Sequence, residues 1–588
     1  MPRNSEPSLT RATRVLERFH PAVREWFDAS FEAPTPPQQQ GWPGIAGGQS
    51  TLILAPTGTG KTLAAFLWCL DCLMFEPVPD KRSRCRVIYI SPLKALAVDV
   101  DRNLRSPLSG ISNRALAHDI PFHTPRVAVR TGDTPAAERA RCLRDPADIL
   151  ITTPESLYLM LTSRASETLT GVDTVIVDEI HALAPTKRGA HLALSLERLE
   201  RLAARPLQRI GLSATQRPLD EVARFLAGAE RSRAASSPAP NTRGIKRRQP
   251  PATEGPESQL EQEFGGRARP AKFRAVTIID AGGRKPIKLS IEMPVEDMAR
   301  LGVPLYIPSG PAAQGPVRSS IWVSIYPRLL ELIGAHRTTL VFVNSRRIAE
   351  RLAGALNELA GEPLVRSHHG SLARPQRLEV EDALKAGKIR GLVATSSLEL
   401  SIDMGAIDLV IQIEAPPSVA RGMQRVGRAG HRIDLPSRGV IFPKYRGDLV
   451  ACATVTRAMH EGRVEATRHP RNPLDVLAQQ IVAMVAMESW DVDELFAAVR
   501  QAAPFAELGR AAYEGVLDML AGRYPSDEFA ELRPRVTWDR VAGTLSTREG
   551  AKRVAIINGG TIPDRGMYGV FLAGAGPRAR LARAGPAR

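Results

Sequence analysis

A glycine-rich stretch early in the chain has the residue types that phosphate chemistry needs. The segment "STLILAPTGTGKTLAAF", residues 50–66, has the pattern of an apolar strand, a loop and the start of a helix. Glycines let backbone N–H groups close around phosphate oxygens at a helix N-terminus. The Lys61 ammonium suits the β- and γ-phosphates, and the Thr62 hydroxyl suits Mg²⁺. The stretch predicts an ATP site built from Thr57, Gly58, Thr59, Gly60, Lys61 and Thr62.

An acid pair follows a second apolar run, in "DTVIVDEIHALAP" at residues 173–185. At the end of a buried strand, Asp178 can hold Mg²⁺, and Glu179 can orient and deprotonate an attacking water. His181 invites a zinc interpretation, but the second histidine of an H-E-x-x-H motif is missing. The alternative is an acid pair in an ordinary turn. The glycine-rich loop about 120 residues upstream favours the hydrolytic interpretation.

A third stretch, "QRVGRAGHR" at residues 424–432, places three arginines and a histidine around two glycines. Its guanidinium groups suit a nucleic-acid backbone, a nucleotide or solvent, and the residue types alone leave these partners open. Upstream of the glycine-rich loop, "FEAPTPPQ" at residues 31–38 offers an aromatic ring and the Gln38 amide, which can pair with an adenine edge. On its own, this last segment is better explained as a proline-rich connector.

The elements that must position these residues show as alternating periodicities. Apolar runs of strand length alternate with helix-period segments from about residue 50 to 230, and again after residue 335. This alternation predicts an α/β fold with two parallel-sheet lobes covered by helices. After residue 470, three helical patterns and short strand-like pieces predict a winged-helix-like module.

A change of composition separates the two lobes. The segment between them is rich in Pro, Ser, Arg, Glu and Gln, so we expect a disordered insertion that cannot bury enough apolar surface to fold. The predicted divisions are an N-terminal helical segment (1–30), a first lobe (31–230), the insertion (231–270), a second lobe (271–450), the winged-helix-like module (451–565) and the start of a further domain with a basic tail (566–588).

Bulk properties point toward a polyanionic partner in a reducing compartment. The 588 residues carry a formal net charge of +17, which favours nucleic acid. No run of about 18 apolar residues and no signal peptide is present, so we expect a cytoplasmic protein. Five cysteines are too few for a disulfide framework, and the "CLDC" pair is expected to pack as small core residues rather than bind metal.

The order of motifs resembles that of superfamily 2 DExH-type helicases. These motifs are "PTPPQ", "APTGTGKT", "SPLKALAVD", "TGDT", "TTPESL", "DEIH", "SAT", "VATSSLELSIDMG" and "QRVGRAGH". More narrowly, "SPLKALAVD", "ATSSLELSIDMGAIDLVIQIEAPPSVARGMQRVGRAGH", "NPLDVLAQQIVA" and "RYPSDEFAELRPR" resemble the bacterial Lhr (large helicase-related) proteins. The resemblance covers nearly the whole chain apart from the insertion and the last fifteen or so residues.

The resemblance implies two tandem RecA-like lobes and an ATP-dependent 3′→5′ translocase on single-stranded DNA. It further implies unwinding of DNA or RNA:DNA duplexes in DNA repair, with ATP and Mg²⁺ as cofactors. Carried over by position, Gln38 contacts adenine and Asp403 contacts the nucleotide sugar or positions arginines. Arg425 and Arg428 reach the γ-phosphate. The implied coupling residues are His181, Ser213, Thr215 and Gln424, and the implied strand contacts are Lys94, Thr153, Asn344, Ser345, Thr395 and Ser396.

Each of these polar strand-contact residues would by itself more often cap a helix or stabilise a turn. The end of the chain also departs from the family, since "AGPRARLARAGPAR" is a low-complexity mix without strand or helix period. We therefore expect a C-terminal truncation, a changed reading frame or a basic tail. Three functions stay open: an active DNA helicase, an RNA-directed helicase, and a truncated nucleic-acid-binding ATPase that does not unwind.

Overall fold

A computed structural model of the chain describes residues 15–56, 58–214, 216–231, 271–282, 286–295, 298, 321–399, 407–430, 436–524, 533–562, 568–571 and 580–584. Three predicted site residues, Thr57, Thr215 and Asp403, lie outside these ranges, as does the predicted insertion apart from Arg231. In the part of the chain that is described, no helix is long and apolar enough to cross a membrane.

The first lobe is built on a seven-stranded parallel sheet in the order β3-β4-β2-β5-β6-β1-β7. Every residue of β1, β2, β4 and β5 is buried, which explains why these strands are continuous apolar runs. The strands are β1 (Thr51–Leu54), β2 (Val87–Ile90), β3 (Val127–Arg130), β4 (Ile149–Thr152), β5 (Thr174–Val177), β6 (Gln208–Ser213) and β7 (Thr277–Asp280).

Helices on both faces of this sheet form two separate apolar cores. The helices are α2 (Pro21–Ser30), α3 (Pro36–Ala46), α4 (Lys61–Phe75), α5 (Lys94–Ala117), α6 (Ala136–Arg144), α7 (Pro154–Leu161), α8 (Ile180–Leu183), α9 (Lys187–Leu202) and α10 (Leu219–Ala227), with the 3₁₀ turn η1 (Arg164–Leu169). Strand β7 falls in the range predicted for the second lobe, but it pairs with β1 and so extends the first sheet.

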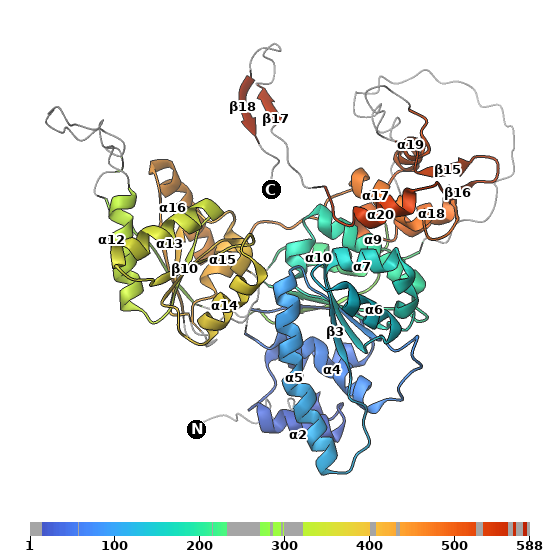
Figure 1. Cartoon of the computed structure of the whole chain (residues 1–588), viewed down its shortest axis with the longest axis horizontal. Coiled ribbons are helices and arrows are strands. Elements are labelled where there is room, and N and C mark those ends of the chain that lie inside the picture. Colours follow the sequence, from blue (N-terminus) through green and yellow to red (C-terminus); the bar gives the residue numbers. More distant parts are fainter. Residues whose placement is uncertain are drawn as a thin grey trace, which may run out of the picture.

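The second lobe has a six-stranded parallel sheet in the order β10-β11-β9-β12-β13-β8. Its strands are β8 (Ile287–Ile291), β9 (Thr339–Phe342), β10 (Val365–His368), β11 (Gly391–Ala394), β12 (Leu409–Ile413) and β13 (Ser437–Phe442). Its helices are α12 (Trp322–Ala335), α13 (Arg346–Ala360), α14 (Arg374–Lys385), η3 (Ser396–Leu398), α15 (Val419–Val426) and α16 (Arg446–Glu461). The two parallel-sheet lobes confirm the α/β fold expected from the periodicities, and they lie side by side in Figure 1.

The third module combines helices with a small antiparallel sheet in the order β14-β16-β15. Its elements are α17 (Leu474–Val485), β14 (Trp490–Asp491), α18 (Val492–Val499), η4 (Ala503–Phe505), α19 (Arg510–Ala521), β15 (Val536–Asp539), β16 (Thr544–Thr547) and α20 (Ala551–Ile557). A separate hairpin pairs β17 (Tyr568–Phe571) with β18 (Arg580–Ala584). Strand β18 therefore lies in the tail for which no strand was expected.

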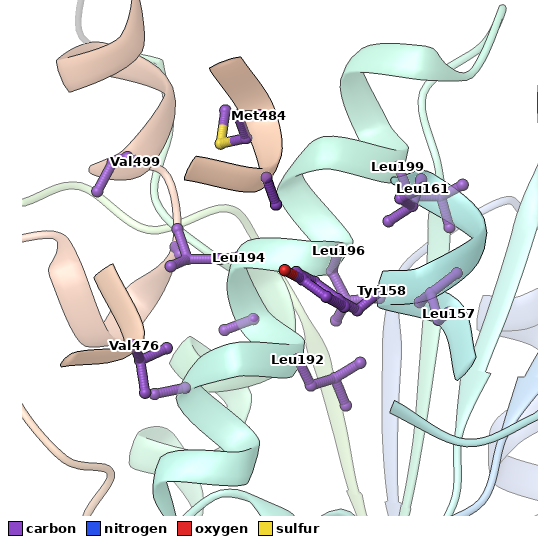
Figure 2. Packing of buried hydrophobic residues seen from close by; sticks show 14 of the residues in the cluster. Leu157, Tyr158, Leu161, Leu192, Leu194, Leu196, Leu199, Val476, Met484 and Val499 are labelled. Carbon is purple, nitrogen blue, oxygen red and sulfur yellow. The ribbon is translucent and has the colours of Figure 1, made fainter. Parts of the chain in front are cut away.

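The third module shares one apolar core with the first lobe. In Figure 2, Leu194 of α9 lies toward Val476 and Met484 of α17, and the Tyr158 hydroxyl of α7 points to the same side. The Tyr158 hydroxyl donates to the carbonyl of Ala555 at 3.1 Å. Because this core runs through both units, the module is held firmly against the first lobe, beside α7, α9 and α10 in Figure 1.

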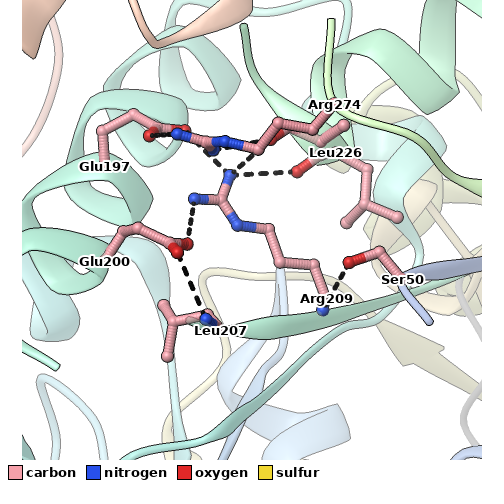
Figure 3. Close-up of polar contacts among 8 residues, drawn as sticks. Ser50, Glu197, Glu200, Leu207, Arg209, Leu226 and Arg274 are labelled. Atoms are coloured by element: carbon pink, nitrogen blue, oxygen red, sulfur yellow. Dashed lines mark hydrogen bonds and ion pairs between the residues drawn. The ribbon is translucent and has the colours of Figure 1, made fainter. Parts of the chain in front are cut away.

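A buried charge network anchors the chain where it returns to the first lobe. Arg209 of β6 donates to Glu197 and to Glu200 of α9, each at 2.8 Å. Arg274 donates to the other oxygen of Glu197 at 2.7 Å, as Figure 3 shows. Nearby, Ala229 and Phe273 form an antiparallel bridge, so these two residues lie side by side on the first lobe.

Candidate nucleotide site and strand-contact segments

The glycine-rich loop joins β1 to α4, and two of its residues need positive φ angles. Gly58 and Gly60 have φ of 82° and 78°, a region that residues with a side chain rarely adopt. A Cβ at Gly60 would also lie 2.7 Å from the Gln38 amide nitrogen. Lys61 begins α4, is buried, and donates from Nζ to the Ser213 carbonyl at 3.2 Å. The loop backbone and the Lys61 ammonium therefore meet at a helix N-terminus, where phosphate groups bind readily.

Gln38 packs directly against this loop. Its Oε1 accepts from the Thr35 N–H at 2.9 Å within a capping box at the start of α3. Its Nε2 donates to the Gly60 carbonyl at 3.4 Å. The amide that the sequence assigns to adenine is thus buried beside the loop and oriented by two backbone contacts.

The acid pair lies at the carboxyl end of β5, which β6 separates from β1 in the sheet. Asp178 Oδ1 accepts from the Glu179 N–H at 2.8 Å, and Asp178 Oδ2 accepts a short hydrogen bond from the Tyr89 hydroxyl. Glu179 is in the left-handed region with φ of 44°. Burial, and then the charge of Glu179, raise the pKa of Asp178 above its ordinary value.

The Asp178 carboxylate is an oxygen ligand of the kind that Mg²⁺ prefers. A divalent ion would stabilise the charged carboxylate, and the Thr62 hydroxyl at the start of α4 is a suitable oxygen donor. Among the described residues, no group of three or more His, Cys, Asp or Glu side chains is placed to hold a metal ion. The residues present therefore fit Mg²⁺ that arrives with phosphate oxygens, and they do not fit a site made of protein ligands alone.

His181 connects the acid pair to the second lobe. Its Nδ1 lies 3.3 Å from Glu179 Oε2 and 3.3 Å from the Ala214 backbone nitrogen. Its Nε2 lies 2.7 Å from Nε2 of Gln424 on α15. Burial lowers the pKa of His181, so the ring is neutral at pH 7 and carries a proton on only one of its two nitrogens. The His181 imidazole is thus the meeting point of three parts of the protein. These are the acid pair with His181 itself (the hydrolytic box, residues 178–181), the segment Ser213–Ala214, and the second lobe.

The two predicted finger arginines have different surroundings. Arg425 is 2% exposed and donates to Glu399, to Asn344 Oδ1 at 3.0 Å and to Gln412 Oε1 at 2.8 Å, all in the second lobe. Arg428 donates to the Glu399 carbonyl at 2.6 Å. Burial lowers the Arg428 pKa, and the negative charges of Glu179 and then Glu399 oppose this shift. The charge of Glu179 in the first lobe thus acts on Arg428, whereas the Arg425 guanidinium is bonded within the second lobe.

An open cavity of about 310 Å³ lies between the lobes at this point. Pro56 and Ala214 line it from the first lobe, and Gln424 and Gly427 line it from the second. Of the predicted site residues that the structure describes, Gln424 lines this cavity, whereas Lys61 and Glu179 do not. A cavity of this size, at the carboxyl ends of parallel strands, is the usual position of a ligand in α/β folds.

The residues expected to contact a strand start helices or follow strands in both lobes. Thr153 precedes α7 and donates to Ser156 at 3.1 Å, and Ser345 caps α13 by accepting from the Ile348 N–H at 3.3 Å. Asn344 donates to the Ala415 carbonyl at 3.1 Å. Lys94 begins α5 and pairs with Asp133. In this structure these side chains therefore make the local helix-cap and turn contacts that were the alternative to strand binding.

In the second lobe, Thr395 and Ser396 stand at the start of η3, directly after β11.

Sequence reasoning missed four residues of this region: Tyr89, Glu155, Arg188 and Glu399. Tyr89 is a single hydroxyl in the aliphatic run "RVIYIS", which is a weak signal of a buried partner. Glu399 lies inside the quoted motif "ATSSLE" but faces Arg425. Arg188 follows the acid pair and reaches Glu155 in a bidentate pair, a contact that only the tertiary structure reveals.

Comparison with known families agrees with this architecture. The DEAD/DEAH box helicase model matches residues 35–222, and the helicase conserved C-terminal domain matches residues 324–433. The winged helix domain of the large helicase-related protein matches residues 457–582. These three matches follow the two parallel-sheet lobes and the third module in order, which confirms a RecA-like helicase fold with a winged-helix domain.

Full-length relatives extend well beyond the matched region. The Lhr helicase/probable uracil glycosylase of Mycolicibacterium smegmatis is 49% identical over 96% of this chain and 36% of its own length. The Lhr helicase/uracil glycosylase of Escherichia coli is 44% identical over 97% of this chain and 36% of its own length. The chain thus spans about a third of the length of these two curated relatives.

A solved structure gives the same assignment. The structure of Mycobacterium smegmatis helicase Lhr bound to ssDNA and AMP-PNP superposes with a TM-score of 0.77 at 49% identity, covering 96% of this chain and 64% of that one. Fold, domain order and identity over nearly the whole chain agree. The chain belongs to the Lhr family of DEAD/DEAH-box helicases.

Proposed function

We propose that this chain is an ATP-dependent helicase and translocase that moves 3′→5′ on single-stranded DNA and unwinds DNA or RNA:DNA duplexes in DNA repair. The observation that carries the proposal is the contact of Gln424 with His181, because it links the hydrolytic acid pair to the opposite lobe. The ssDNA and AMP-PNP of the solved Lhr relative support both classes of ligand for this chain.

ATP would bind between the lobes, with the glycine-rich loop around its phosphates and the Gln38 amide near its base. Lys61, which now donates to the Ser213 carbonyl, would neutralise charge on the β- and γ-phosphates. Glu179 would orient and deprotonate the attacking water. Thr62 and Asp178 would hold Mg²⁺, which when bound neutralises charge on the phosphate oxygens.

Charge from the second lobe would complete the site. The negative charge of Glu179 acts on Arg428 from across the lobe boundary. We therefore assign to Arg428 the role of the arginine finger, which stabilises charge on the transferring γ-phosphate. Arg425 would instead hold the segment that carries Arg428, because its donors are already used by Glu399, Asn344 and Gln412. Asp403 keeps its proposed contact with the nucleotide sugar or the arginines.

Movement would follow from closure of the two lobes on ATP and opening after hydrolysis. Lys94 and Thr153 of the first lobe, and Asn344 and Ser345 of the second, would hold successive backbone phosphates. Thr395 and Ser396 would add contacts after β11. His181, Ser213, Thr215 and Gln424 would pass the state of the nucleotide to these segments. The division of the chain into two lobes and a winged-helix module, with an insertion at 231–270, is part of this proposal.

A strand-displacement assay tests the proposal. We expect ATP-dependent displacement from a duplex with a 3′ single-stranded DNA tail and none from the same duplex with a 5′ tail. Stimulation of ATP hydrolysis by DNA but not by RNA would support the DNA helicase. Stronger stimulation by RNA would favour an RNA-directed helicase. Stimulated hydrolysis without displacement of either duplex would identify a nucleic-acid-binding ATPase that does not unwind.

A further inference from the structure

Arg188, in the first turn of α9, joins the two first-lobe segments that are proposed to hold the strand. Its NH1 donates to the Pro92 carbonyl at 2.6 Å. Its NH2 donates to Glu155 Oε2 at 2.9 Å, and its Nε donates to Glu155 Oε1. All three nitrogens of the guanidinium therefore donate hydrogen bonds, and they do so to two separate segments. A lysine cannot reproduce this geometry.

The two segments are the ends of neighbouring strands. Pro92 follows β2 and precedes Lys94, and Glu155 follows β4 two residues after Thr153; β2 and β4 pair directly in the sheet. Burial raises the pKa of Glu155, but the hydrogen bonds and charge of Arg188 outweigh it and the net pKa is lowered. The carboxylate is thus ionised at pH 7, and the bidentate pair is charge-assisted.

The start of α9 is in turn fixed to the hydrolytic box. Helix α8 begins directly after Glu179 and ends at Leu183, whose carbonyl accepts from the Thr186 hydroxyl at 2.7 Å. The same Thr186 oxygen caps α9 by accepting from the Gly189 N–H at 3.1 Å. A Cβ at Gly189 would lie 2.1 Å from the Leu183 carbonyl oxygen, so the turn between the helices is closely packed.

The neighbouring residue extends this connection to the third module. Lys187 pairs with Asp475 of α17 at 2.9 Å.

Because Thr186 joins the end of α8 to the start of α9, a displacement of the acid pair would move α8 and the start of α9 together. Through Arg188, the same displacement would reach both strand segments of the first lobe.

We propose that Arg188 is a positioning residue that couples the two strand-contact segments to the hydrolytic box. Among the described residues, its hydrogen bonds go to Pro92 and Glu155 and not to the nucleotide site, and it acts by holding these two residues at a set distance from α9. The inference rests on the proposed function, because it assumes that these segments bind single-stranded DNA. It assigns to one side chain the communication between strand binding and ATP turnover within the first lobe.

The test measures ATP hydrolysis by the full chain as a function of single-stranded oligo(dT), at one fixed salt concentration because phosphate contacts depend strongly on salt. For Arg188→Lys we expect the half-saturating DNA concentration to rise about tenfold, as for other mutations along an energetic link. The KM for ATP should change by less than about twofold, since the change lies outside the nucleotide site. Arg201→Ala, which removes a guanidinium on the same helix that contacts Trp490 instead, is the matched control.

A double-mutant cycle separates positioning from loss of stability. If Arg188 acts through Glu155, the effects of Arg188→Ala and Glu155→Gln on half-saturation should be clearly non-additive. Unchanged half-saturation in Arg188→Lys, or an equal rise in the KM for ATP, would overturn the inference. A wild-type chain whose hydrolysis does not respond to single-stranded DNA would instead contradict the proposed function, so the two failures are distinguishable.

Discussion

The Nε2 atoms of Gln424 and His181 lie 2.7 Å apart, across the boundary between the two lobes. The other nitrogen of this imidazole lies 3.3 Å from the Glu179 carboxylate. A side chain of the second lobe is thus one residue removed from the proposed hydrolytic base. Any change in the spacing of the lobes must make or break this contact, so it is a direct physical link between lobe closure and hydrolysis.

Gln424→Ala should separate unwinding from hydrolysis. The variant removes the amide and leaves His181 with its two first-lobe contacts, so the acid pair should still hydrolyse ATP. We expect duplex displacement per ATP consumed to fall about tenfold, the size of a typical coupling free energy between two sites. Displacement and ssDNA-stimulated hydrolysis are measured on the same preparation. An equal fall in both rates would show that the contact serves hydrolysis alone.

Substitutions of Arg425 and Arg428 should have different effects, the first mainly on stability and the second mainly on ATP turnover. Arg425→Ala leaves the Glu399 carboxylate, which is 5% exposed, with only the longer contact of 3.9 Å to Arg421 in place of its close ion pair. We expect a loss of about 3–5 kcal/mol in the stability of the second lobe, as for other broken buried pairs. Arg428→Ala should lower ATP turnover about a thousandfold if it acts as the finger, with a smaller change in Tm. Thermal unfolding and steady-state hydrolysis distinguish them, and a stable Arg425→Ala variant with lost turnover would reverse the assignment.

Tyr89 should tune the use of Mg²⁺. Its hydroxyl donates to Asp178, so Tyr89→Phe removes an oriented hydrogen bond from a proposed metal-binding carboxylate. We expect the Mg²⁺ concentration for half-maximal hydrolysis to rise about tenfold, the effect usual for an outer-shell partner. Tyr158→Phe is the matched control, because it removes a hydroxyl that donates to the Ala555 carbonyl. That bond lies in the apolar core shared by the first lobe and the third module (the joint core). The same Mg²⁺ dependence in both variants would remove Tyr89 from the site.

The joint core of the first lobe and the third module should weaken in acid through His191. Burial lowers the pKa of this imidazole to about 4, with Glu155 opposing the shift and Arg198 adding to it. The unfolded ring has a pKa of about 6.5, so as the pH falls the unfolded state gains its proton first. Stability from the neutral ring is complete above about pH 6.5 and is lost between about pH 6.5 and about pH 4.

The loss from this one residue should be about 2 kcal/mol between pH 7 and pH 5. Denaturant unfolding of the wild type and of His191→Gln at both pH values isolates the contribution of this ring from those of other titrating groups. The variant should lose less stability than the wild type by about this amount. Equal losses in both proteins would show that His191 does not carry the pH dependence.

The local motifs predicted much of the nucleotide site. A glycine-rich loop and an acid pair at a strand end determine backbone geometry over a few residues, so Lys61 and Asp178 follow two strands of one sheet, β1 and β5, with β6 between them. Parallel strands buried on both faces also leave a clear apolar signal, which is why the two α/β lobes were predicted correctly.

Partners of long side chains did not follow from local pattern. The burial of Arg425 depends on Glu399 and Gln412, which lie on two other elements. Arg188 of α9 reaches Glu155 of the neighbouring helix α7, and nothing in the spacing of the two residues in the sequence indicates this. Strand β7 joins the first sheet because the edge of β1 is available for pairing. The sequence of β7 itself does not indicate which of the two sheets it joins.

The central claim is that the two lobes form a nucleic-acid-stimulated ATP hydrolase with Lys61 and Glu179 at its centre. Its most direct test compares ATP hydrolysis by the wild-type chain, Lys61→Ala and Glu179→Gln, each with and without single-stranded DNA. The account predicts hydrolysis by the wild type that rises with DNA, and hydrolysis at background level in both variants under every condition. Normal turnover in either variant, or a wild type that hydrolyses no ATP with DNA present, would contradict it.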